Sequence, residues 1–261
     1  MLAAVAPLDG RVLAGGQTLV PAMAMRLARP GHLVDINHVA GFDRLELTAE
    51  GLRIAPCVRH AALGPEGVPG PLGRLLGLAR RHIAHYPIRT RGTFCGSLAN
   101  ADAASEWCLV AVALDATLIA RSERGTRQLT ADDFLAGYMT TALEPDELLV
   151  EAFLPVLPPE TRVGFYEFSR RAGDFAEVMA LATFELRDGL VANPRVAVGG
   201  IEARPRRLHD AEAALTGQRL DDAGLRRAAD AAAAEVDPPE DHEDARRLVA
   251  TAVTRALASA L

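Results

Sequence analysis

The pattern of hydrophobic positions divides the chain into an N-terminal part of short β-type runs and helices and a C-terminal part of longer β-type runs followed by helices. Alternating apolar positions predict strands, and apolar positions three or four residues apart predict helices. In the N-terminal part we expect strands at residues 11–14, 32–36, 45–47, 52–54, 117–121, 126–129 and 148–154, and helices at residues 19–28, 72–84 and 106–114. In the C-terminal part we expect strands at residues 163–168, 178–186 and 190–198, and helices at residues 210–215, 221–236 and 240–261. Prolines at 155, 158 and 159 separate the parts and predict two domains, residues 1–155 and residues 160–261.

Residues 88–102, with the sequence IRTRGTFCGSLANAD, follow neither period and are rich in glycine, hydroxyl and amide side chains. We therefore expect this segment to be a functional loop. A second glycine break lies earlier, where Gly15 and Gly16 separate the first predicted strand from the first predicted helix.

Composition excludes several kinds of chemistry. The 34 acidic side chains outnumber the 28 basic ones, and the net charge of -6 disfavours a nucleic-acid partner, which needs clustered cations. Every basic residue is arginine; without lysine the chain has neither a P-loop nor a Schiff-base nucleophile. Cys57, Cys95 and Cys108 are too few for an iron–sulfur cluster and do not suggest a disulfide framework, so we expect a cytoplasmic protein. The apolar start, residues 1–8, lacks the basic region of a signal peptide, and no apolar run reaches the length of a membrane span.

The first glycine segment, Ala14 to Leu19 (AGGQTL), is expected to bind an anion. Two adjacent glycines allow backbone N–H groups to converge on a phosphate without Cβ clashes, and the predicted helix adds the positive end of its dipole. Thr18 offers a hydroxyl donor as well. A simple tight turn is the alternative interpretation of the same pair.

The second glycine segment, Thr93 to Ser97 preceded by Gly92, again offers backbone donors and hydroxyls without fixed charge. Two uncharged segments of this kind suit a pyrophosphate held between them. Side chains suited to ribose hydroxyls follow at Asn100, Asp102 and Glu106. The alternative for these polar residues is a turn or a helix cap, with Asp102 or Ser105 capping the next helix.

Other motifs narrow the choice of site. No two of the 22 glycines lie two residues apart, so the G-x-G-x-x-G fingerprint is absent and a Rossmann dinucleotide site is not expected. His82 and His85 share a helix end, but no nearby cysteine or carboxylate completes a metal site, and we favour a polar helix face. Neither a G-x-S-x-G motif nor a nucleophile–base pair is present, so no catalytic side chain is expected.

Five segments together resemble the FAD-binding medium subunit of molybdenum hydroxylases, a family that includes flavoprotein subunits of carbon monoxide, xanthine, nicotine and aromatic dehydrogenases. The similar segments, in the family's order, are AGGQTL at 14–19, IRTRGTFCGSLANAD at 88–102, FLAGYMTTALEPDELL at 134–149, FYEFSRRAGDFA at 165–176 and VAVGGIEARPRRL at 196–208. The resemblance implies an α+β protein, with an N-terminal FAD-binding domain of the vanillyl-alcohol-oxidase type (PCMH) and a C-terminal α+β domain with a small antiparallel sheet and helices.

The resemblance also implies cofactors and partners. FAD would be bound without covalent attachment, and electrons would pass from a molybdenum cofactor in a large subunit, through [2Fe–2S] clusters in a small subunit, to this flavin and then to an external acceptor. A dimer of heterotrimers is the expected assembly, without nucleic acid and without membrane insertion. The positions implied to bind FAD are Ala14, Gly15, Gly16, Gln17, Thr18, Leu19, Thr93, Cys95, Gly96, Ser97, Asn100, Asp102, Glu106 and Leu149.

Two features depart from the family pattern. Cys95 occupies a position where relatives usually carry glycine, so a side chain there would crowd the pyrophosphate or press against the flavin. Relatives usually carry a further strand and helix before the first glycine segment, whereas only 13 residues precede Ala14 here. Two other hypotheses stay open: a self-contained flavin oxidoreductase of a related family, and a scaffold subunit whose flavin site has degenerated.

Overall fold

The computed structural model describes residues 9–239 and 244–261, and the chain forms two compact units. Unit 1 consists of Met1–Ala62, His85–Ala101 and Asp115–Val156, and unit 2 consists of Leu63–Ala84, Asp102–Leu114 and Leu157–Leu261. The apolar start at residues 1–8 and the beginning of the last predicted helix at residues 240–243 lie outside the described residues. Separate folding of residues 1–155 and 160–261 stays a prediction.

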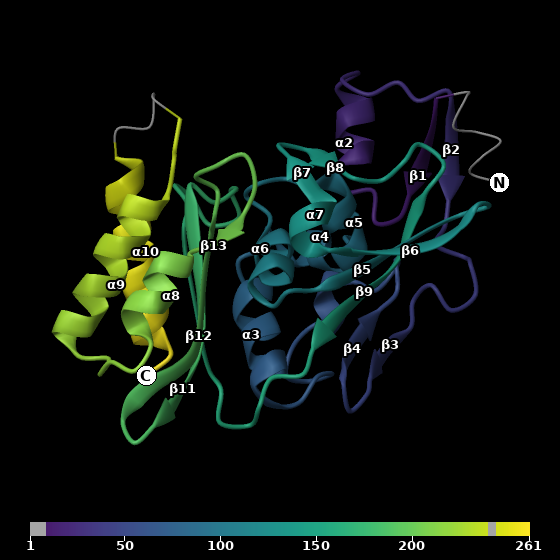
Figure 1. Ribbon diagram of the computed structural model, residues 1–261. Helices are drawn as coiled ribbons and strands as arrows, with labels where there is room; N and C mark the ends of the chain where they lie inside the picture. The colour runs from purple at the N-terminus through teal and green to yellow at the C-terminus, as the bar shows by residue number, and fades with distance from the viewer. Residues whose placement is uncertain (1–8, 240–243) are drawn as a thin grey trace. The chain divides into compact units, whose positions relative to one another are not determined.

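Unit 1 contains a small parallel sheet, a larger antiparallel sheet and a hairpin of β7 (Leu135–Gly137) and β8 (Thr140–Thr141) (Figure 1). In the smaller sheet, β1 (Gly10–Leu13) pairs in parallel with β2 (His32–Asp35), and α2 (Leu19–Ala24) lies between them in sequence. The larger sheet is antiparallel and has the order β3-β4-β9-β5-β6, from β3 (Leu45–Leu47), β4 (Gly51–Ile54), β9 (Leu148–Pro155), β5 (Thr117–Ser122) and β6 (Gly125–Thr130). The strands predicted at residues 45–47, 52–54, 117–121 and 126–129 are confirmed, and they pair as two hairpins.

Several short elements of unit 1 were not predicted. They are η2 (His60–Ala62), α4 (Tyr86–Arg89), α5 (Phe94–Asn100), α7 (Ala131–Phe134), β7 (Leu135–Gly137) and β8 (Thr140–Thr141). The predicted loop at residues 88–102 was therefore wrong, because it contains the end of α4 and all of α5. Thr93 caps this helix, and Phe94, Cys95 and Leu98 are buried, but three apolar positions in one short helix do not establish a period.

Unit 2 is a four-stranded antiparallel sheet with helices on both faces. The strand order is β10-β11-β12-β13, from β10 (Arg162–Phe168), β11 (Val178–Arg187), β12 (Leu190–Gly199) and β13 (Arg206–Arg207). One face packs against α8 (His209–Leu215) and α10 (Ala245–Ser259), which α9 (Asp222–Glu235) contacts in turn, and the other face packs against α3 (Gly70–Arg80) and α6 (Glu106–Ala113). β11 is buried on both faces for this reason.

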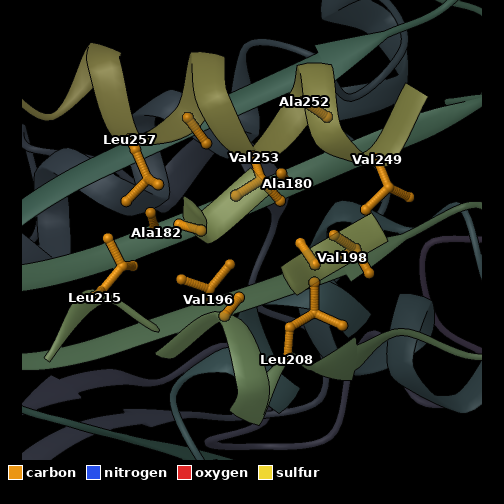
Figure 2. Packing of buried hydrophobic residues seen from close by; sticks show 14 of the residues in the cluster. Ala180, Ala182, Val196, Val198, Leu208, Leu215, Val249, Ala252, Val253 and Leu257 are labelled. Atoms are coloured by element: carbon orange, nitrogen blue, oxygen red, sulfur yellow. The ribbon is translucent and has the colours of Figure 1, made fainter. Parts of the chain in front are cut away.

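The main hydrophobic core of unit 2 lies between the sheet and the C-terminal helices. Figure 2 shows Val249 and Val253 of α10 beside Ala180 of β11 in this cluster. The small alanine side chains on β11 allow α10 to approach the sheet closely. At Gly164 of β10, a Cβ would overlap the backbone oxygen of Ala256 in α10, so this contact requires glycine.

The α+β class predicted from the sequence is confirmed, and so are the three strands and the helices of its C-terminal part within the described residues. The turn between β11 and β12 contains Asp188 and Gly189, both with positive φ, as a tight hairpin requires. No helix in residues 9–239 and 244–261 has the length and apolar character needed to cross a membrane.

Candidate functional site

The first glycine segment leaves β1 at the edge of the small sheet and enters α2. Gly16 has φ +70°, a left-handed conformation that L side chains rarely adopt, and the Gln17 amide donates to the Gly15 carbonyl at 2.8 Å. Within the described residues, we find no hydrogen-bond partner for the backbone N–H groups of Gly16, Gln17 and Thr18. Three successive open N–H donors in one loop are of the kind that can bind an anion.

The helix after this segment is shorter than predicted. α2 ends at Ala24, and Arg26 has φ +62°, which stops the expected continuation to residue 28. None of the α2 residues is buried, so tertiary packing does not extend the helix. A helix of six residues adds little dipole, and the loop's own N–H groups remain the donors of the segment.

The second glycine segment uses most of its polar groups internally. The Thr93 hydroxyl accepts from the Gly96 N–H at 3.1 Å as the N-cap of α5, and the Ser97 N–H donates to the Thr93 carbonyl at 3.0 Å. The Phe94 N–H donates to the Val58 carbonyl. The prediction that this segment is a loop of open backbone donors was therefore wrong, because it forms the first turn of a helix. Thr93 is buried and acts as a cap.

The fold brings the two glycine segments into direct contact within unit 1. A Cβ built on Gly15 would lie 2.5 Å from the Arg91 carbonyl oxygen and 2.7 Å from the Gly92 Cα. Both neighbours are backbone, so only glycine permits this approach. Sequence reasoning placed both segments at one ligand, and the structure shows how closely they pack.

His60 supports the second segment from behind and was not identified from the sequence. Its backbone N–H donates to the Gly92 carbonyl at 3.0 Å, and its ring occupies the space that a Cβ at Gly92 would need. Burial, reinforced by the charges of Arg59 and Arg89, lowers the pKa of His60 to about 4. The imidazole is therefore neutral near pH 7 and serves as a packed support.

Asn37 and Arg59 connect the two segments and were also missed. Arg59 donates from Nη1 to the Arg91 carbonyl at 2.5 Å and from Nη2 to the Asn37 Oδ1 at 2.7 Å. The Asn37 Nδ2 in turn donates to the Ala14 carbonyl at 2.8 Å. The Asp-x-Asn sequence at the end of β2 is a turn signal, but nothing in the sequence places Arg59 beside it.

Cys95 and Leu149 both lie in the interior of unit 1. Cys95 is 3% exposed, and its Sγ contacts the Ile54 carbonyl oxygen at 3.5 Å. Burial raises the pKa of the thiol far above its usual range, which keeps it protonated and unreactive. Leu149 is 3% exposed within β9, where it pairs with Ala120 of β5.

The polar residues expected near ribose divide between the units. Asn100 is half-buried on α5 in unit 1, whereas Asp102 and Glu106 belong to unit 2. Ser97, expected at the pyrophosphate, is also half-buried on α5. The Asp102 carboxylate accepts from the Ala104 N–H at 2.9 Å, and the Ser105 hydroxyl accepts from the Cys108 N–H, so Ser105 is the cap of α6.

Glu106 faces a second acid in unit 2. Burial raises its pKa to about 8, with the charge of Glu167 as the next cause. Burial also raises the pKa of Glu167 to about 7, and His82 Nδ1 lies 3.8 Å from its Oε1. The His82 ring packs against Phe165, and burial lowers its pKa. Desolvation and the charge of Glu167 thus favour the protonated state of Glu106 near neutral pH.

The first segment fits the diphosphate of a dinucleotide. Its three open N–H donors suit phosphate oxygens. The Arg59 guanidinium lies at the junction of the two segments and adds a positive charge that the sequence had not assigned to the site.

Comparison with known families covers almost the whole chain. Residues 2–157 match the family described as "FAD binding domain in molybdopterin dehydrogenase", and residues 164–260 match "CO dehydrogenase flavoprotein C-terminal domain". The two matches agree with the resemblance derived from the glycine segments and the C-terminal motifs.

Individual proteins give the same result. The medium subunit of nicotine 6-hydroxylase from Paenarthrobacter nicotinovorans is 39% identical, with 81% of this chain and 74% of that protein covered. The subunit alpha of the 6-hydroxypseudooxynicotine dehydrogenase complex from the same organism is 37% identical, with 97% and 87% covered. A carbon monoxide dehydrogenase structure from Hydrogenophaga pseudoflava superposes with a TM-score of 0.91 at 29% identity, over 99% of this chain and 92% of that one. The chain therefore belongs to the FAD-binding flavoprotein family of the molybdopterin dehydrogenases, with a carbon monoxide dehydrogenase-type C-terminal domain.

Proposed function

We propose that this chain is the electron-transfer subunit of a molybdenum hydroxylase complex and holds FAD without a covalent bond. The observation that carries the proposal is the contact between the two glycine segments, beside which three successive N–H groups are open to a diphosphate. Bound FAD would supply an electron carrier that accepts electrons singly and releases them singly or in pairs.

The residues proposed to hold FAD follow from this geometry. Gly15 and Gly16 provide close backbone approach, and the N–H groups of Gly16, Gln17 and Thr18 bind the diphosphate. Ala14 and Leu19 flank these donors. Gly96, Ser97 and Asn100 present the half-buried side of α5 to the same ligand.

The buried members of the predicted site take other roles. Thr93 caps α5, the Cys95 thiol packs against β4, and Leu149 packs within the sheet, so we propose that these three shape the site without touching the ligand. Electrons would reach the flavin from outside the chain.

The partners proposed here follow the relatives, whose names describe a medium subunit and a subunit of a dehydrogenase complex. We propose a large subunit with the molybdenum cofactor, a small subunit with [2Fe–2S] clusters, and a dimer of such heterotrimers in the cytoplasm. The flavin would accept electrons from the clusters and pass them to an external acceptor.

A complex purified through a tag on this chain tests the proposal. One FAD per copy, released by acid into the supernatant, and co-purification of molybdenum and iron are expected. Reduction of the flavin by substrate should require the partner subunits. Flavin reduction by substrate with this chain alone would favour a self-contained oxidoreductase, and a complex without FAD would favour a scaffold subunit.

A further inference from the structure

The carbonyl groups of Ala14 and Arg91 are joined through two side chains in unit 1. From Ala14 the connection passes through the Asn37 amide to the Arg59 guanidinium, and from there to Arg91, over hydrogen bonds of 2.8, 2.7 and 2.5 Å. Ala14 precedes Gly15 and Arg91 precedes Gly92, so each end of the connection holds a peptide plane next to a glycine.

We infer that Asn37 and Arg59 form a clamp that sets the spacing of the two glycine segments and thereby the affinity for FAD. The inference rests on the proposed function. A glycine peptide rotates easily, so the direction of the N–H groups that follow it depends on what holds the plane. The clamp holds both planes at once, and Asn37 and Arg59 are therefore positioning residues.

The two ends of the clamp are themselves anchored. The Asn37 backbone N–H and its Nδ2 both donate to the Asp35 Oδ1, at 2.9 and 2.6 Å, at the end of β2. These bonds are the main reason why the pKa of the exposed Asp35 lies below its usual value. Arg59 lies opposite Thr93 in a β-bridge, which ties its backbone to the start of α5. The side chains therefore span two fixed backbones.

The geometry requires the fork of an arginine. One guanidinium reaches two acceptors that belong to different segments, whereas a lysine ammonium is a point charge without a planar fork. Arg59→Lys therefore keeps the positive charge but loses the clamp. Asn37→Ala keeps the whole of Arg59 but breaks the link to Ala14.

A different role for Arg59 is simple attraction of the diphosphate by its charge. In that case Arg59→Lys would retain most of the affinity for FAD, and Asn37→Ala would leave the Kd for FAD unchanged. The affinity would also fall steeply with salt in every variant. The clamp predicts similar losses for both single variants and little further loss in the double variant, because each breaks the same connection.

The experiment is an FAD titration of the flavin-stripped full-length chain, followed by flavin fluorescence, for wild type, R59K, N37A and the double variant. The matched control is R53K. Arg53 is an arginine of the same unit, on β4, and it pairs with Glu151 of β9 at 2.7 Å. We expect Kd to rise about tenfold or more in R59K, N37A and the double variant, and to stay unchanged in R53K. Thermal unfolding of each flavin-free chain separates positioning from stability.

The Kd values and the thermal midpoints decide between a positioning role and a merely structural role. A lower thermal midpoint with an unchanged Kd would show a merely structural role and overturn the inference. Additive losses in the double variant would also overturn it. If R59K does not fold, N37A alone decides, because it removes one half-buried amide and leaves the charge in place. A wild-type chain that binds no FAD would overturn the proposed function, and the clamp with it, whereas normal binding in both single variants would overturn the clamp alone.

Discussion

Gly15→Ala is the most direct test of the contact between the glycine segments. The added Cβ would lie 2.5 Å from the Arg91 carbonyl oxygen and 2.7 Å from the Gly92 Cα. An ordinary carbon–oxygen contact is about 3.3 Å, so the segments must separate by about 0.8 Å. Neither obstacle is a flexible side chain, and Arg91 is also held by Arg59, so the strain must be relieved by moving backbone.

The size of the effect follows from the cost of overpacking, about 1–3 kcal/mol for one added carbon in a closely packed contact. If the strain is relieved by moving the segments apart, the backbone N–H donors no longer converge on the diphosphate. The cost then appears as weaker binding of FAD. A cost of this size corresponds to about a 5- to 150-fold rise in the Kd for FAD. The thermal midpoint of the flavin-free chain should fall only slightly, because unit 1 can relax at this loop.

Flavin fluorescence titration of the stripped chain measures the Kd directly. Gly137→Ala is the matched control, because a Cβ at Gly137 meets nothing within 4 Å and its φ is compatible with alanine. We expect the control to bind FAD as the wild type does. An unchanged Kd in Gly15→Ala would refute the close approach of the two segments as the basis of the site.

Three further predictions concern stability and chemistry. Gly164→Ala should lower the free energy of unfolding by about 3 kcal/mol or more in urea denaturation, because the Cβ overlaps the Ala256 backbone, and a loss below about 1 kcal/mol would contradict this packing. The raised pKa values of Glu106 and Glu167 mean that the folded state binds more protons than the unfolded state, so the stability of the flavin-free chain should fall by several kcal/mol as pH rises from about 5 to about 9. Glu106→Gln should flatten that profile, and an equally steep profile in the variant would argue against the raised pKa of Glu106. Cys95→Ala should leave the FAD content and the release of FAD by acid unchanged, because the thiol faces the Ile54 carbonyl. Flavin retained in the acid pellet of the wild type would contradict non-covalent binding.

Local patterns in the sequence were sufficient for the longer elements. The apolar face of α3, with Leu72, Leu75 and Leu76, is buried as its spacing predicts, and the strands of unit 2 follow their alternating or continuous apolar runs. The glycine pair at 15 and 16 and the glycines around Cys95 were sufficient to indicate two ligand-binding segments. Their joint resemblance to a flavoprotein family added the cofactor, because a set of ordered motifs is far more specific than either glycine segment alone.

Tertiary structure decided the details of the site. The segment around Thr93 is a helix because burial of Phe94 and Leu98 stabilises a turn that is too short to show a period. Its Gly96 N–H therefore donates to the Thr93 cap rather than to a ligand. His60 and the pair of Asn37 and Arg59 act across 22 to 32 positions of the chain, a distance over which no local pattern operates. The sequence by itself determined the class of fold and which segments are proposed to bind a ligand, since both depend on local periodicity and on glycine's missing Cβ. Only the folded chain decided which donors stay open and what holds them in place, because long-range packing brings those partners together.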